Sequence, residues 1–344
     1  MDRIKTFRRS KKAQVESQFN WLFVLIIGVI ILAFFTVIVL KQKTSSEIKF
    51  AGKMSQQLNT ILVGAKVSSG TVQEIPVPEM DVQFQCNDYF IGPASQRLGN
   101  RIIFAPEYLK TNKLVTWTLD WSVPFKVASI LYVSSPFVRY VIIGGTADDP
   151  DATKLHGLLP EKMNKQVFSI SDYSSGAILD ENDRHVRFIF VNQGTVFNIP
   201  QTFSDSEVSG LSLNTNTNEA QFLVRSLSDS SSFTTLGPRH VYNEPEILYA
   251  AIFSTNPEEY ECLMKRLYER LNVVAQIYSA RLNEMADGGV RSSCQGNYRS
   301  NAELQSIITT TNTYPPAYPL LTAAKTKLRE TNERLQLQSC PMIY

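Results

Sequence analysis

Residues 21–40 read WLFVLIIGVIILAFFTVIVL, twenty residues in succession without a charged side chain. At about 1.5 Å per residue, a helix of this length spans about 30 Å, the thickness of the hydrocarbon core of a bilayer. Helices of soluble domains nearly always keep a polar stripe, and the apolar core of a secretory signal peptide is only about 7–15 residues long. The stretch therefore predicts a transmembrane helix over residues 19–41.

Basic side chains are concentrated before this stretch. Residues 1–12 carry six basic side chains and one acidic one, whereas the rest of the chain carries 28 basic against 31 acidic side chains. Because cytoplasmic flanks of transmembrane helices are enriched in Lys and Arg, residues 1–18 are predicted to be a cytoplasmic basic leader or tail. The main mass is then extracytoplasmic at the cell membrane. Its weakly acidic balance offers no basic field to nucleic acid, so the lipid bilayer is an expected partner and nucleic acid is not.

The stretch KKAQVESQFNWLFVLIIG, Lys11 to Gly28, resembles the class III signal peptide of archaeal type IV pilin-like proteins. In that family a membrane peptidase removes a short basic leader on the cytoplasmic side, and the apolar segment is kept as the membrane or filament helix. The resemblance implies a processing junction between Ala13 and Gln14. An uncleaved signal anchor is the alternative.

One feature of the family pattern is changed in this chain. Many pilin-like proteins carry a glutamate five residues into the mature chain, where it neutralises the new amino terminus of a neighbouring subunit. Here the fifth residue after the junction is Gln18, and the nearest acid is Glu16, the third, which becomes the candidate assembly carboxylate. The change counts against tight filament packing, and the large outer part favours a minor or standalone component.

The residues after the apolar stretch predict a stalk and a linker. Over residues 42–70, apolar side chains recur close to a helical period, so an amphipathic stalk helix is expected. Residues 71–80 contain Pro76 and Pro78, which exclude a helix and predict an extended linker.

The outer part divides by its pattern. Residues 81–255 are predicted to be a β-rich or α/β extracytoplasmic domain. A strand, a Gly-rich turn, a short helix and a strand around 138–170 indicate an α/β unit. The polar stretches 204–218 and 226–235 are expected to be loops or hairpin turns. Together with the helices that follow, the fold class is α+β, with α/β as the alternative.

Residues 256–344 are predicted to be a helical portion. Asn256 and Pro257 mark a helix start, and apolar residues then follow one face to about Met285. Ser300 with Glu303 matches a capping box. A last helix is expected over residues 320–337.

The four cysteines, Cys86, Cys262, Cys294 and Cys340, all lie after the apolar stretch. An extracytoplasmic setting favours two disulfides. The predicted helix that begins at Pro257 separates Cys262 from the far helix end by roughly 35 Å, which disfavours a bridge from Cys262 to Cys294. The favoured pairs are Cys294–Cys340 and Cys86–Cys262, with buried free thiols as the alternative.

Motifs for chemistry are sparse. The three histidines, His156, His185 and His240, stand apart in the sequence and match no metal-ligand spacing. Residues 144–146 (GGT) offer backbone N–H groups to an anion or form a simple turn. The acidic residues Asp148, Asp149 and Asp151 suggest calcium or, more simply, a solvated turn and helix cap. No catalytic, metal or cofactor-binding residue is assigned and no cofactor is expected.

Three classes of function fit these features. The first is a pilin-like or other cell-surface component that binds partners or self-assembles. The second is an anchored receptor or binding module unrelated to filaments. The third is an anchored hydrolase whose catalytic residues are dispersed in the sequence, although an enzyme is the less favoured class.

Overall fold

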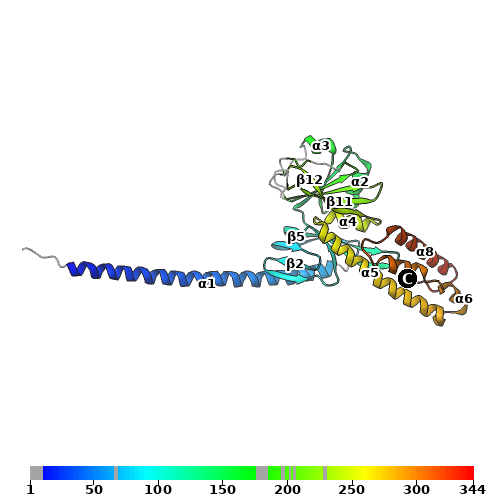
Figure 1. Cartoon of the computed structure of the whole chain (residues 1–344), viewed down its shortest axis with the longest axis horizontal. Coiled ribbons are helices and arrows are strands. Elements are labelled where there is room, and N and C mark those ends of the chain that lie inside the picture. Colours follow the sequence, from blue (N-terminus) through cyan, green and yellow to red (C-terminus); the bar gives the residue numbers. More distant parts are fainter. Residues whose placement is uncertain are drawn as a thin grey trace, which may run out of the picture. The chain divides into compact units, whose positions relative to one another are not determined.

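The computed structural model describes residues 11–65, 69–175, 185–194, 198–200, 203, 207–227 and 231–344, apart from the side chains of 11–20, 43–47, 65, 289 and 292. Within this part the chain combines helices with two six-stranded sheets, an α+β fold (Figure 1). It divides into an N-terminal unit, up to Lys53, and a C-terminal unit, from Met54 to Tyr344.

The first element, α1 (Lys11–Ala65), is one helix of 55 residues. Its segment Trp21–Gln42 has 22 residues and a mean hydropathy of 3.3, and none of it is buried. A helix of this length and composition can cross a membrane. The basic residues of 1–10 lie outside the described part.

The last turns of α1 belong to the C-terminal unit. Met54, Leu58 and Leu62 recur at four-residue spacing and are buried. The Tyr89 hydroxyl donates to the carbonyl of Ser55 at 2.8 Å. The predicted stalk is therefore helical to Ala65, and its apolar face is part of a core.

The first sheet has the strand order β3-β2-β1-β5-β6-β4. Its strands are β1 (Val72–Phe84), β2 (Asp88–Ile91), β3 (Ala94–Arg97), β4 (Ile102–Phe104), β5 (Tyr108–Ser122) and β6 (Lys126–Ser134). The prediction of a linker over 71–80 is wrong, because this segment pairs with β5 and places Val72 opposite Trp117. The register shifts between Pro76 and Met80, which accommodates prolines that cannot donate to a ladder.

The second sheet has the order β12-β11-β10-β9-β7-β8. Its strands are β7 (Val138–Gly144), β8 (Asn164–Ser169), β9 (His185–Val191), β10 (Glu207–Asn214), β11 (Glu219–Arg225) and β12 (Phe233–Val241). The strands β8, β7, β9 and β10 are parallel, and β11 and β12 add an antiparallel edge. The predicted α/β unit around 138–170 is confirmed. The prediction of loops over 204–218 is wrong at β10, whose Leu211 and Leu213 are buried.

The helices of the C-terminal unit are α2 (Pro150–Leu158), α3 (Ile170–Ser175), α4 (Pro245–Phe253), α5 (Pro257–Glu284), α6 (Ser292–Gln295), α7 (Ala302–Thr310) and α8 (Tyr318–Leu337), with short turns at Met285–Gly289 and Gly296–Tyr298. The predicted start of α5 is confirmed, since the Asn256 side chain accepts from the Glu258 N–H at 2.9 Å. The predicted capping box is wrong, because Asn301 is the residue that precedes α7 and no side chain caps it.

Helices α4 and α5 join the two sheets in one main core (Figure 1). On the first sheet, Trp117 packs against Tyr249 of α4, with ring centroids 4.7 Å apart. On the second, Phe222 packs against Tyr260 of α5 at 5.3 Å. A smaller core covers the opposite face of the second sheet. Its members include Phe188, Phe190, Phe203 and Phe233.

Candidate functional site

Four parallel strands of the second sheet end at one edge, and the chain changes face there. Helix α2, between β7 and β8, contributes Ala152 and Leu155 to the main core. Helix α3, between β8 and β9, contributes Tyr173 to the smaller core on the opposite face. The point between β7 and β9 is therefore a topological switch point, where open α/β sheets bind ligands beyond the carboxyl ends of their strands.

The N-terminus of α2 at this switch point is already occupied by a side chain. The Asp149 carboxylate accepts from the N–H groups of Asp151 and Ala152, at 3.1 and 3.0 Å. Its other oxygen accepts from the Gly145 N–H at 3.1 Å. A Cβ atom on Gly144 would lie 2.4 Å from that of Asp149, so only glycine fits there. The turn-and-cap interpretation is confirmed, and the N–H groups that an external phosphate would use are taken.

A polar network ties the first turn of α2 to the residues that follow β9 and β10. Asp151 Oδ2 accepts from Asn192 Nδ2 at 2.8 Å and from Thr215 Oγ1 at 2.9 Å. The Thr215 N–H donates to Asn192 Oδ1 at 2.8 Å. Asn192 has a φ of 55°, a left-handed conformation that asparagine tolerates. Asn192 and Thr215 were not singled out from the sequence. Each directly follows a strand, and this position is the signal that could have identified them.

A cleft of about 330 Å³ lies beside this network. The residues that line it are Asn192, Gln193, Ser212, Leu213, Asn214, Asn216, Glu219, Gln221, Leu223, Thr235 and Arg239. Ser212 is paired with Gln221, and Leu223 with Thr235, so the floor is the face of β10, β11 and β12. Among the described residues that line it, the charged ones are Glu219 and Arg239, which lie 3.6 Å apart as an ion pair. The cleft is therefore polar and close to neutral.

The three histidines have separate surroundings and do not contribute to this cleft. His185 Nδ1 lies 3.3 Å from Glu207. His156 is in α2, and its carbonyl accepts from Lys165 at 2.6 Å. His240 Nε2 lies 3.7 Å from Glu261. A second cleft, of about 260 Å³ between α5, α7 and α8, also has no histidine in its lining.

His240 gives the C-terminal unit a specific response to acid. It is buried on β12 against Phe222 and Tyr260, and burial lowers its pKa from 6.5 to about 4. Between these values the unfolded imidazole binds a proton and the folded one does not, so stability falls as pH drops from 6.5 to 4. The size of this pKa shift limits the loss attributable to His240 to about 3 kcal/mol. Attraction between Glu261 and the protonated ring makes the loss smaller.

The measurement is denaturant unfolding of the natural protein and His240→Gln at several pH values between 4 and 7. The difference in unfolding free energy between the two proteins isolates His240 from the carboxyl groups that titrate in the same range. We expect the variant to lose less stability on acidification. Parallel curves would contradict this role.

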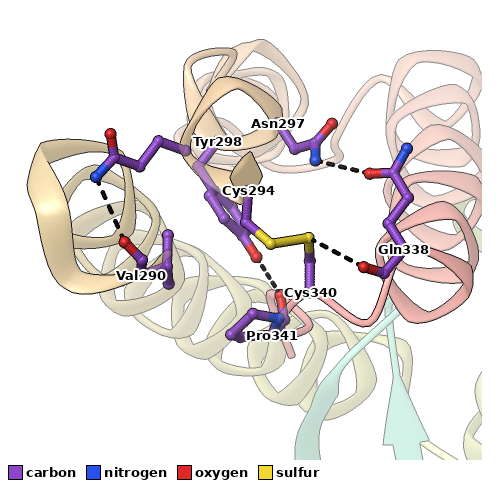
Figure 2. Close-up of a disulfide and its surroundings, with 8 residues drawn as sticks. Val290, Cys294, Asn297, Tyr298, Gln338, Cys340 and Pro341 are labelled. Carbon is purple, nitrogen blue, oxygen red and sulfur yellow. Dashed lines mark hydrogen bonds between the residues drawn. A yellow bond between two sulfur atoms is a disulfide. The ribbon is translucent and has the colours of Figure 1, made fainter. Parts of the chain in front are cut away.

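All four cysteines are paired, as the favoured connectivity predicts. Cys86, after β1, is bonded to Cys262 in the second turn of α5, at a sequence separation of 176. Cys294 of α6 is bonded to Cys340 after α8 (Figure 2). Close to the second bond, the Tyr298 hydroxyl donates to the Pro341 carbonyl at 2.6 Å. Two bridges in one unit are typical of proteins in oxidising compartments.

The processing residues lie at the amino end of α1. The backbone of Ala13, Gln14 and Glu16 is helical, and their side chains lie outside the described part. Neither the junction between Ala13 and Gln14 nor the assembly role of Glu16 is tested by the geometry.

No protein-family model, curated protein or solved structure matches this chain. The function proposed below therefore rests on the chain's own residues.

Proposed function

We propose that this chain is a single-pass membrane protein whose C-terminal unit lies outside the cytoplasm and acts as a cell-surface binding or assembly component. The observation that carries the proposal is the segment Trp21–Gln42, which has no charged residue before Lys41 and no buried residue. About 25 cal/mol is gained for each Å² of apolar surface removed from water, so lipid strongly stabilises such a segment. The two disulfides support an oxidising compartment for the C-terminal unit.

Within this proposal, the pilin-like form is favoured by α1 itself. One uninterrupted helix carries both the apolar segment and the buried residues Met54, Leu58 and Leu62. An element of this kind tethers the C-terminal unit and can also pack against other copies. An anchored receptor unrelated to filaments is the second candidate, favoured by the polar cleft over β10, β11 and β12.

N-terminal sequencing of the chain extracted from membranes separates the two candidates. Processing of the pilin type leaves a mature chain that begins at Gln14, and Ala13→Leu should block the cut. A chain that keeps Met1 would contradict the pilin-like form and leave the anchored receptor. Recovery of the natural chain in the soluble fraction after alkaline extraction would contradict both.

A further inference from the structure

The floor of the polar cleft on β10, β11 and β12 carries groups with unused hydrogen-bonding capacity. The Ser212 hydroxyl, half-buried, and the Thr235 hydroxyl have no partner among the described residues. The Gln221 side chain donates through Nε2 to the carbonyls of Leu236 and Gly237, at 3.2 and 3.0 Å. These bonds hold the amide in place and leave its oxygen as an acceptor.

The charges of the cleft argue for an uncharged ligand. Arg239 is paired with Glu219, and Glu219 Oε2 also accepts from the Thr217 hydroxyl at 3.1 Å. The opposite charges of this pair lie side by side, so the cleft offers no net charge to an anion or a cation. A phosphate is further disfavoured because Asp149 already holds the N–H groups at the start of α2.

The remaining groups match a ligand rich in hydroxyls. Neighbouring hydroxyls both donate and accept, and the cleft offers donors and acceptors at short intervals. These are the side-chain oxygens of Gln193 and Gln221, the amide nitrogen of Asn214, the amide of Asn216, and the hydroxyls of Ser212 and Thr235. The volume of about 330 Å³ is at the small end of ligand sites, which span roughly 300–1,000 Å³. Of the described lining residues, only Leu213 and Leu223 are apolar, so an apolar ligand has little surface to cover.

We infer that this cleft binds a sugar, either free or as the end of a glycan. This inference goes beyond the proposed function. It rests on that function only for the compartment in which the protein encounters the sugar. Binding by the isolated protein does not depend on which way the chain crosses the membrane.

The test uses the full chain in nanodiscs free of glycolipid, because many detergents carry sugar headgroups. Glucose, galactose, mannose and N-acetylglucosamine are titrated calorimetrically, at concentrations up to on the order of 10 mM, where a site with millimolar affinity is nearly saturated. Gln221→Leu removes the acceptor and should weaken binding roughly tenfold. Thr235→Ala should weaken it about threefold. Thermal melting confirms that each variant is folded.

The neighbouring residue supplies a matched control. Thr234 is exposed like Thr235 but points to the other face of β12, because side chains alternate along a strand. Thr234→Ala should leave binding unchanged. Binding of free monosaccharides supports the inference and identifies free sugar as the ligand. Binding of immobilised oligosaccharides alone also supports it and identifies a surface glycan as the ligand. Absence of binding to both, equal binding by all variants, or binding of inorganic phosphate in their place would overturn it.

Discussion

Replacement of Arg187 by alanine is expected to lower the free energy of unfolding of the C-terminal unit by about 3–5 kcal/mol. Arg187 is fully buried on β9. Nη1 donates to the Gly210 carbonyl of β10 at 2.9 Å, and Nη2 to the Ala251 carbonyl in the last turn of α4 at 3.0 Å. Alanine would leave two buried carbonyls without these donors and open a cavity beside Phe222, whose ring centroid lies 5.4 Å from the guanidinium.

The charge of Arg187 is stabilised by dipoles. Among the described residues no carboxylate pairs with it, and burial lowers its pKa to about 9, so it is still a cation at neutral pH. The carbonyl end of α4 carries partial negative charge that suits this cation. Thermal and denaturant unfolding check the prediction. Arg187→Met keeps most of the volume and should lose roughly 2 kcal/mol. An alanine variant within about 1 kcal/mol of the natural protein would show that these hydrogen bonds contribute little.

Removal of the Cys86–Cys262 bond by replacing both cysteines with alanine is expected to cost about 3–5 kcal/mol. The bond closes a loop of 176 residues. Without the bond, the unfolded chain gains conformational entropy, and this gain is larger for a longer loop. The same contact is supported by Arg266 of α5, whose Nη1 donates to the Cys86 carbonyl at 2.6 Å, so the native arrangement should persist in the variant.

The second disulfide provides the comparison. Cys294 and Cys340 are 46 residues apart, and the end of the chain is also held by Asn332, which accepts from the Ile343 N–H at 2.8 Å. Replacing both of these cysteines with alanine should therefore cost less, about 2–4 kcal/mol. Melting curves of the two double variants, recorded without reductant, measure both losses. A smaller loss at Cys86–Cys262 than at Cys294–Cys340 would contradict the loop-length argument.

The features predicted correctly from the sequence depend on neighbouring residues. The apolar helix is set by composition over residues 21–40, and the start of α5 by Asn256 and Pro257. The cysteine pairing followed from the length of α5, which keeps Cys262 away from Cys294. In each case a local rule of length or capping was sufficient.

The features that were missed depend on partners distant in the chain. Residues 71–80 contain two prolines and resemble a linker, but their partner β5 lies more than thirty residues later and draws them into a sheet. The polar stretch around β10 resembles a loop because only alternate residues, such as Leu211 and Leu213, face the core. The polar cleft combines residues of β10, β11 and β12 with the loop after β9, so no single stretch could reveal it.

The central claim is that the C-terminal unit lies outside the cytoplasm. Lys154 of α2 is exposed, and Lys154→Cys provides one free thiol beside four paired cysteines. Intact cells that express this variant are treated with a maleimide that cannot cross membranes, and a cytoplasmic thiol protein serves as the internal control. We predict labelling of Cys at this position without permeabilisation. If the variant is labelled only after permeabilisation, when the cytoplasmic control protein is also labelled, the account is contradicted.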